Sequence, residues 1–285
     1  MPATNAFDTV ASTALYNNIT QAGLYQLNEK SVMRNLIRNY NMVGTPGLTA
    51  SVPIYPTVAV SSPADGADLT NATFDVTTSK TITASERGVM VTLTDLMKET
   101  ATDNVAQAVG TQIGGALAEQ FDKDVAALFA GFTTNVVGSG ARELTVEDLF
   151  KAQALLRSNN VPSGDIYCVL HPKQAFQIKK SLSNTFGASG NVSDVANEAI
   201  RTGFVGRIAN LVIVESNTVT GDSAGAFVGG AFHQDALGVM IKREFRIENQ
   251  RDASLRADEI VGSWAYGVSE LFDEYGVALI GDANL

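Results

Sequence analysis

The hydrophobic pattern is clearest in the middle of the chain. Between Thr102 and Ala130 apolar side chains recur every three or four residues, the spacing that places them on one helix face. They are Val105, Val109, Ile113, Leu117, Phe121, Val125 and Leu128. Thr102 suits an N-cap and Gly131 a stop. The pattern predicts a helix over 102–130, roughly 40 Å long at 1.5 Å per residue.

Glycines interrupt this predicted helix at three positions. Gly110, Gly114 and Gly115 each weaken a helix interior by about 1 kcal/mol relative to alanine. Such a cost is tolerated where a neighbouring backbone packs closely. We therefore expect these glycines to be packing sites, against a strand, rather than hinges.

Before the helix, the sequence changes character twice. Residues 1–50 carry few large apolar side chains, with a weak helical stripe at Val32, Leu36 and Ile37 after Ser31. They indicate an arm lying on another surface; a frayed terminus is the alternative. Residues 51–93 alternate apolar and polar positions on both sides of a tip rich in turn residues, SSPADGADLTNA.

The alternating segment predicts a long β-ribbon. Its apolar positions are Val52, Ile54, Val58 and Val60, then Phe74 and Val76, and finally Val89, Val91 and Leu93. Two strands alone are marginal in water, so a ribbon with so little to bury needs another surface. The alternative is a pair of ordinary sheet strands joined by a long loop.

From residue 144 the pattern is mixed α/β. Thr145 and Asp148 suit a capping box at the start of a helix that stops near Asn159. A strand over 166–170 follows, and His171–Pro172 leads into another helix. The sequence of residues 183–203 predicts a surface loop. Further strands are expected at 211–215, 226–230, 237–242, 259–268 and 275–281.

Composition narrows the classes of function. Hydrophobic residues make up 45% of the 285 and charged residues 18%, as in ordinary packed proteins. The net charge of −10 argues against a surface that neutralises phosphates, so we expect no sequence-specific nucleic-acid binding. With one cysteine there is no intrachain disulfide, and neither a signal peptide nor a membrane-spanning stretch is expected.

No constellation of catalytic, cofactor-binding or metal-ligating residues emerges. His171 and His233 lie far apart without ligand spacing, and His171 is better explained as a turn residue bonding local backbone. Cys168, inside an apolar strand, is expected to be buried and inert. Asp65 and Asp68 lack the further acids of a calcium loop.

Neighbouring acids are also plentiful: Asp122 with Asp124, Asp258 with Glu259, and Asp273 with Glu274. Adjacent residues point in different directions, so we expect these pairs to be solvated surface charge. In contrast, residues 242–259 mix both signs. Such a run suits complementary contacts between copies of one protein, and a solvated face is the alternative.

Four stretches of the sequence, taken in their order along the chain, resemble a known protein family. The stretches are TLTDLMKETATDNVAQAVGTQIGGALAEQFDKDVAALFAGF, LTVEDLFKAQALLRSNNVPSGDIYCVLHPKQAFQIKK, GRIANLVIVESNTV and IKREFRIENQRDASLRADEIVGSWAYGVSELFDEYGVALI. Taken together and in this order, from about Ser51 on, they resemble the major capsid proteins of tailed bacteriophages. The fold that this resemblance implies is α+β, of the Hong Kong 97 type.

The resemblance implies a division of the chain. It gives an N-terminal arm (1–50), an extended β-hairpin loop (51–93), a peripheral domain with the spine helix (94–144), an axial domain (145–236), a return to the peripheral domain (237–259) and closing strands of the axial domain (260–285). The implied function is a structural subunit without enzymatic activity or cofactors. It would self-assemble into pentamers and hexamers of an icosahedral shell around double-stranded DNA.

The implied partners are identical subunits, with a separate scaffold, portal or decoration protein as further ones. The implied place is the virion capsid, after synthesis in the host cytoplasm. The residues we expect at subunit interfaces are Asp65, Asp68, Lys80, Glu86, Arg87, Arg243, Glu244, Arg246 and Arg251. Some family members cross-link Lys to Asn between subunits; Lys80 and Asn71 are weak evidence for it, and we expect no cross-link.

Two alternatives remain open at this point. An encapsulin-type compartment shell, which holds a cargo enzyme, shares the fold. A monomeric α/β hydrolase or ligand-binding protein belongs to a different class, and it predicts a pocket with convergent polar groups.

Overall fold

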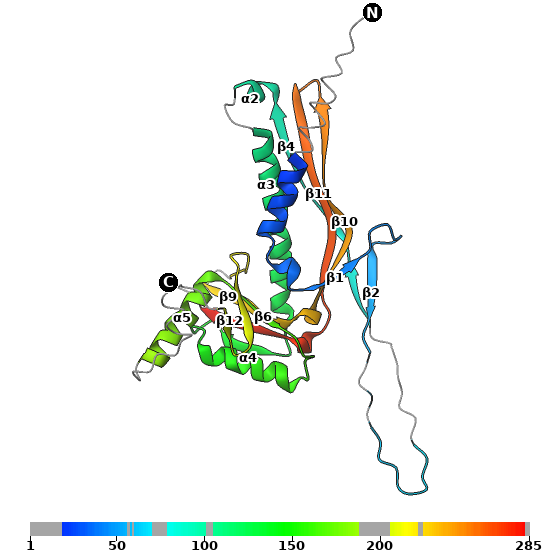
Figure 1. Cartoon of the computed structure of the whole chain (residues 1–285), viewed down its shortest axis with the longest axis vertical. Coiled ribbons are helices and arrows are strands. Elements are labelled where there is room, and N and C mark those ends of the chain that lie inside the picture. Colours follow the sequence, from blue (N-terminus) through cyan, green and yellow to red (C-terminus); the bar gives the residue numbers. More distant parts are fainter. Residues whose placement is uncertain are drawn as a thin grey trace, which may run out of the picture.

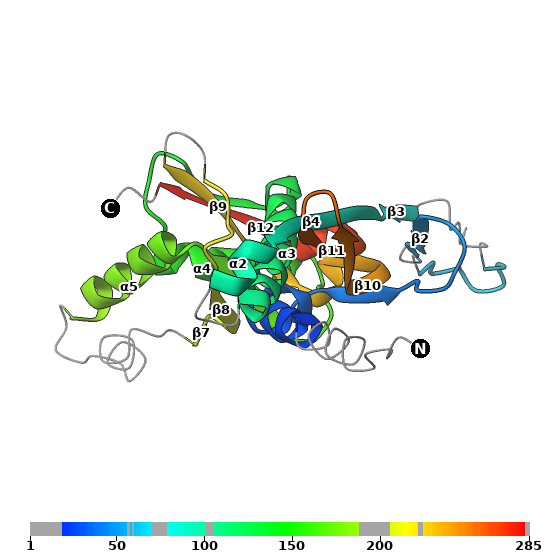
Figure 2. The same ribbon diagram turned by 90° about the horizontal axis from the view of Figure 1, so that it is seen from above.

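The computed structural model describes residues 19–55, 58, 60–69, 79–100, 105–187, 206–221 and 225–282. They form two lobes, one around a four-stranded sheet and one around a six-stranded sheet, and a two-stranded ribbon. Figure 1 shows the first lobe as a long vertical body, the second beside its lower end, and the ribbon projecting on the other side. From above, α5 and the ribbon point in opposite directions (Figure 2).

The long lobe is built on a sheet in the order β1-β10-β11-β4. Its strands are β1 (Arg38–Asn41), β4 (Ser85–Thr94), β10 (Leu237–Asp252) and β11 (Ala257–Glu270). β1 runs parallel to β10, whereas the pairs β10–β11 and β11–β4 are antiparallel. Register shifts interrupt the β10–β11 ladder between Ile241 and Arg246. The strand predicted at 237–242 is therefore only the first part of β10, and the one predicted at 259–268 is the central part of β11.

One long helix covers a face of this sheet. It is α3 (Val105–Ala126), continued by the 3-10 segment η2 (Ala127–Gly131). The predicted apolar stripe is confirmed, since Ile113, Leu117, Phe121 and Val125 are buried. Phe121 stacks on Trp264 of β11 with ring centroids 5.0 Å apart. The predicted N-cap, Thr102, lies outside the described residues.

The second lobe contains a sheet in the order β5-β12-β9-β6-β8-β7. The bounds are β5 Val136–Ser139, β6 Ile166–Leu170, β7 Arg207–Ile208, β8 Leu211–Glu215, β9 Ala226–His233 and β12 Gly276–Asp282. Side chains of α4 (Val146–Ser158) and α5 (Pro172–Gly187) share one apolar core with it. Alternate residues of β6, such as Val169, join the core of the long lobe instead. Because β6 is buried on both faces, it is an unbroken apolar run.

Local signals in this lobe are mostly confirmed. Thr145 and Asp148 form the predicted capping box at the start of α4. His171 takes the predicted turn role, since its Nδ1 accepts a hydrogen bond from the backbone N–H of Lys173 at 3.2 Å. The loop predicted over 183–203 is wrong at its start, because α5 continues to Gly187. Residues 188–203 lie outside the described part of the chain.

The ribbon is shorter than the sequence predicts. Among its described residues, β2 (Thr49–Pro53) and β3 (Ser79–Thr83) are the strands that pair as the projecting hairpin. The third apolar run, with Val89, Val91 and Leu93, is β4 and belongs to the long sheet. Phe74 and Val76 lie outside the described residues. Likewise, residues 260–270 of the predicted closing segment belong to β11 and pair with β10 and β4, and within the described part of that segment only β12 joins the six-stranded sheet.

The N-terminal segment is the largest departure from expectation. Residues 19–30 form a helix, which the sequence pattern did not predict, and it lies alongside α3 (Figure 1). Ile19 and Leu27 are buried in the core of the long lobe, followed by Met33, Leu36 and Ile37. The stripe after Ser31 forms a short 3-10 turn and then β1, not a helix. From residue 19 to 41, the expected arm therefore packs on its own subunit.

Glycines make this helix pair possible. A Cβ at Gly110 would lie 2.5 Å from the carbonyl oxygen of Ile19, and one at Gly114 would overlap the carbonyl oxygen of Gly23. The two backbones therefore touch. The predicted packing role of Gly110 and Gly114 is confirmed, but their partner is a helix rather than a strand.

A buried carboxylate fixes the end of the N-terminal helix. Asp122 of α3, 2% exposed, accepts hydrogen bonds from the backbone N–H groups of Val32 at 3.0 Å and Met33 at 3.3 Å, and from Ser31 Oγ at 3.2 Å. Burial raises the pKa of Asp122, against the opposing effect of these three bonds. The expectation that Asp122 is solvated surface charge is therefore wrong.

We predict that Gly114→Ala destabilises the subunit by about 1–3 kcal/mol, because overpacking against the Gly23 carbonyl outweighs the gain in helix propensity. Urea unfolding measures the loss. Gly115→Ala is the matched control: its Cβ would meet the end of the Lys30 side chain at 3.0 Å, which can move away. Equal destabilisation by both substitutions would contradict the backbone contact.

Candidate subunit interfaces

The ribbon exposes apolar side chains that its own subunit does not cover. At its base, Ala50, Val52 and Ile82 belong to a small core with Met240 and Leu271. Beyond the base, large apolar residues are exposed: Tyr55, Val58, Val60 at 99% and Leu69 at 72%. Because water-facing apolar residues in a row are unfavourable, this stretch has the character of a contact surface.

Two predicted interface residues lie at the ribbon tip. Asp65 and Asp68 are exposed; Asp65 lies within a turn in which Gly66 has φ +81°, and Asp68 follows this turn. The backbone N–H of Ala67 closes this turn on the carbonyl of Ala64 at 3.0 Å. The tip therefore presents negative charge next to apolar side chains.

The other predicted interface residues have partners within the chain. Arg87 pairs with Asp124 at 3.2 Å, Glu244 with Arg34 at 3.6 Å, Arg246 with Glu248 at 3.3 Å and Lys80 with Glu270 at 3.9 Å. Glu86 of β4 and Arg243 of β10 pair with each other across β11, the strand that lies between theirs. Most of these side chains are half exposed, so a neighbouring subunit still has access to them.

Arg243 differs from the rest of this set. Its terminal nitrogen bonds Glu86, but its Nε is buried without a hydrogen-bond partner, a state it shares with Trp264 Nε1 among the described residues. An unsatisfied buried donor is costly. Glu86 therefore holds only part of the guanidinium, and the register shifts of β10 beside Arg243 mark an irregular point of the sheet.

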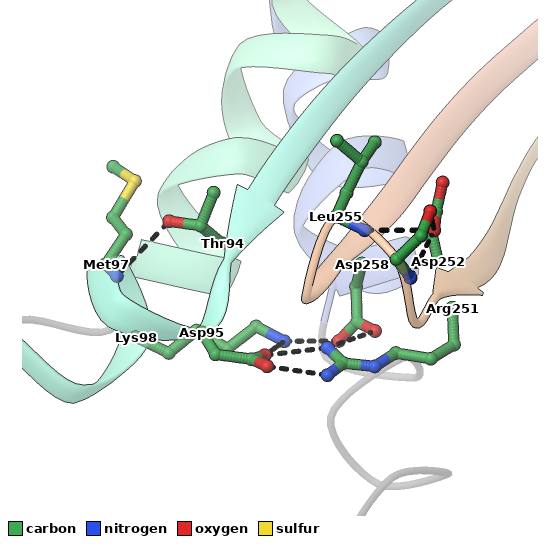
Figure 3. Close-up of polar contacts among 9 residues, drawn as sticks. Thr94, Asp95, Met97, Lys98, Arg251, Asp252, Leu255 and Asp258 are labelled. Carbon is green, nitrogen blue, oxygen red and sulfur yellow. Dashed lines mark hydrogen bonds and ion pairs between the residues drawn. The ribbon is translucent and has the colours of Figure 1, made fainter.

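The far end of the long lobe carries a denser charge network. Arg251 of β10 bonds both carboxylate oxygens of Asp95, at 2.5 and 2.6 Å, and reaches Asp258 of β11 at 3.3 Å. Lys98 adds contacts to both acids. Figure 3 shows the four side chains converging between the start of α2 (Asp95–Thr100) and the β10–β11 turn. Arg251 thus links two elements of its own subunit.

The network favours the ionised form of Asp95. The hydrogen bonds from Arg251 are the main reason why the pKa of Asp95 lies below its ordinary value, against a smaller effect of burial. The same bonds raise the pKa of Arg251. Because the pKa of Asp95 is lower in the folded subunit, its ionised carboxylate stabilises the fold at pH values above the ordinary aspartate pKa. This contribution is lost as the pH falls through the lowered pKa of Asp95.

Apolar side chains surround this network, and sequence reasoning missed them. Leu96 is 70% exposed, Met97 49% and Leu255 57%. Their neighbours in sequence are charged, so no alternation or helical stripe distinguishes them. The available signal is the pair Leu96–Met97, which directly follows a strand and an acidic residue.

Among the described residues no cluster of three or more His, Cys, Asp or Glu side chains can hold a metal ion. Cys168 is buried as predicted, and burial raises its pKa to about 12. Within the same part of the chain, no helix has the length and apolar character needed to cross a membrane.

Comparison with protein-family models identifies the family of this chain. A family model described as phage capsid protein matches residues 77–280, more than half of the chain. The chain belongs to the phage capsid protein family. No curated protein sequence matches this capsid protein.

Solved capsid structures share its fold. The capsid of cyanophage P-SCSP1u aligns with a TM-score of 0.70 at 20% identity, covering 89% of each chain. Mycobacterium phage Che8 gives 0.67 at 19%, covering 87% of this chain and 90% of that one. The acid-stable capsid of Helicobacter pylori bacteriophage KHP30 gives 0.67 at 13%, covering 89% and 92%. They confirm the expected Hong Kong 97-type fold.

We predict that Arg251→Met raises the pKa of Asp95 towards its ordinary value, because the two bonds that stabilise the carboxylate are lost. NMR titration of the labelled carboxyl carbon measures the pKa. Arg246→Met is the control on the same strand, since Arg246 pairs with Glu248 instead. An unchanged Asp95 pKa in Arg251→Met would show that the bidentate contact does not form in solution.

Proposed function

We propose that this capsid protein is the subunit of an icosahedral shell, assembling into pentamers and hexamers that enclose double-stranded DNA. The observation that carries the proposal is the ribbon, whose exposed apolar residues have no core of their own. Family membership and the capsid folds of the structural neighbours support it.

In this proposal the ribbon is completed by a neighbour. A copy of the chain that covers Tyr55, Val58, Val60 and Leu69 would remove their apolar surface from water. Repeated around a ring, the same contact closes a capsomer, because head-to-tail contacts related by rotation form closed rings. Of the predicted interface residues, Asp65 and Asp68 have the clearest access to such a neighbour.

We also propose a domain division that follows the sheets. The four-stranded sheet with α3 is the peripheral domain, and the six-stranded sheet with α4 and α5 is the axial domain at the capsomer centre. The extended loop is then the β2–β3 ribbon, and β11 belongs to the peripheral domain. Residues 19–41 then belong to the peripheral domain rather than to an N-terminal arm.

The acidic composition fits enclosure of DNA without tight binding. A net charge of −10 gives no general attraction for phosphates, so DNA can move against the inner wall. The role is structural rather than enzymatic. Scaffold, portal and decoration proteins are proposed as later partners, and synthesis in the host cytoplasm as the first step.

Purified protein at rising concentration tests the assembly directly. Light scattering and negative-stain microscopy are expected to show rings of five or six and large closed particles. A monodisperse 30.1 kDa monomer at high concentration, with and without a crowding agent, would overturn the proposal.

We predict that deletion of residues 61–69 blocks particle formation while the subunit keeps its urea midpoint. The deleted residues lie beyond the buried base at Ala50, Val52 and Ile82, so the fold does not depend on them. Asp65→Ser with Asp68→Ser is the milder companion variant, which removes the tip charge alone. Loss of subunit folding after the deletion would show that the ribbon belongs to the core.

We predict that Arg246→Glu impairs assembly more than subunit stability. Its internal pair with Glu248 is exposed and worth about 0–1 kcal/mol, so the subunit loses little. Particle yield and the unfolding midpoint are measured together. Lys151→Glu is the control, an equally exposed charge paired with Glu147 on α4. Parallel losses in both measurements would contradict a contact role for Arg246.

A further inference from the structure

We propose that the turn at the end of the ribbon is a site of spontaneous chemical modification, at which the Asp65–Gly66 peptide rearranges to isoaspartate. After the rearrangement the main chain runs through the side-chain carboxyl carbon of Asp65 instead of its backbone carbonyl carbon. The modification depends on these two residues alone. Its consequence, a gradual loss of assembly by subunits that are still unassembled, rests on the proposed shell function.

The turn leaves both reacting groups unprotected. Every residue from Val60 to Leu69 is exposed, and Figure 1 shows this stretch at the free end of the ribbon, away from both lobes. Within the described part of the chain, neither the Asp65 carboxyl group nor the Gly66 N–H has a hydrogen-bond partner. Apart from the adjacent residues, nothing lies within 4 Å of the point that a Cβ on Gly66 would occupy. Few contacts therefore oppose a change of conformation at this peptide.

The glycine that the turn requires also makes it reactive. Gly66 has φ +81°, a conformation that glycine adopts without steric cost at this position of a turn. The missing Cβ also leaves the backbone nitrogen of Gly66 open to the carboxyl group of the residue before it. Asp65–Gly66 is the one place in the sequence where glycine directly follows aspartate, and nowhere does it follow asparagine. The chain therefore offers one such peptide, in its most exposed turn.

The reaction needs no reagent other than water. The backbone nitrogen of Gly66 attacks Cγ of Asp65, and a C–N bond forms. The nitrogen's proton and the carboxyl hydroxyl group leave as one molecule of water, which closes a five-membered succinimide ring. Water then opens the ring at one of its two carbonyl carbons. Opening at Cγ restores Asp65, and opening at the backbone carbonyl carbon leaves isoaspartate.

Isoaspartate changes the shape of the tip. The main chain becomes longer by one carbon atom between Ala64 and Ala67, so the hydrogen bond that closes this turn at 3.0 Å loses its geometry. The negative charge remains, but on a shorter branch. Since the proposed neighbour covers Val60 and Leu69 on either side of the turn, an altered tip fits that neighbour less well. The same contact, once made, restrains the turn and protects it from the reaction.

Peptide mapping of the unassembled subunit tests the modification itself. The protein is kept at neutral pH, and the peptide that spans the tip is followed by chromatography with electron-transfer fragmentation, which locates isoaspartate. Asp68, in the same exposed stretch but followed by Leu69, is the internal control. Isoaspartate is expected to form at position 65 about tenfold faster than at 68, equivalent to about 1.4 kcal/mol of barrier. No isoaspartate at position 65, or equal rates at the two positions, would overturn the proposal.

Two substitutions at position 65 test the ring chemistry. Asp65→Glu keeps the charge, but its longer side chain would have to close a six-membered ring, so the modification is expected to disappear. Asp65→Asn is expected to react faster than wild type, because its amide is a better electrophile than a carboxylate; it releases ammonia in place of water. An isomer that forms at position 65 in Asp65→Glu at the wild-type rate would rule out the succinimide route.

Stored samples test the consequence for assembly. Each protein is kept unassembled, and its particle yield is compared with that of its own fresh sample. Wild type and the matched variant Asp68→Glu are expected to lose yield in proportion to their isoaspartate content, whereas Asp65→Glu keeps its yield. Wild-type particles stored in the assembled state are expected to keep Asp65 unmodified.

The outcomes separate this inference from the proposed function. If isoaspartate accumulates and stored wild type still assembles like its fresh sample, the consequence for assembly is wrong and the shell function stands. If fresh wild type forms no particles under any condition, the shell function fails. Peptide mapping then still decides whether Asp65–Gly66 is modified.

Discussion

Contact between α3 and the long sheet is the interaction on which the rest of the molecule depends. The buried stripe of α3 includes Phe121, which stacks on Trp264 and meets Tyr266 edge-on at 5.1 Å between ring centroids. The other side of α3 supports the N-terminal helix through glycine contacts and Asp122. Its 3-10 end then enters the second lobe, where Phe129 packs against Phe232. One helix thus connects three parts of the fold.

The subunit buries the cores of both sheets and pairs most of its sheet charges by itself, but it leaves several apolar side chains exposed to water. Both sheets have complete cores, and most charged residues on β4 and β10 have internal partners. Some of the apolar side chains left in water lie on the ribbon and at the opposite end of the long lobe, and others, such as Tyr25, Phe150 and Phe176, lie elsewhere on the surface. Paired charges on a sheet stabilise the subunit itself, so charge alone does not distinguish an assembly surface from an ordinary one.

Sequence patterns predicted elements whose burial is periodic. The stripe of α3, the capping box of α4 and the unbroken apolar run of β6 each report a local environment that the sequence encodes directly. The sheet to which β4 belongs could not be predicted, because alternation is the same in a projecting ribbon and in a long sheet. Residues 19–30 escaped prediction for another reason. In this helix Ile19, Gly23 and Leu27 are the buried residues. Gly23 contacts α3 through its backbone, so no apolar side chain marks its position in the sequence pattern.

The isolated thiol of this chain has a practical consequence. Cys168, the one cysteine of the sequence, is fully enclosed in β6, so a native subunit offers alkylating reagents nothing to react with. A cysteine introduced at any exposed position would then be the sole reactive group per copy. Fluorophores, spin labels or cargo attached to that cysteine would then occupy the same position in every subunit of the particle.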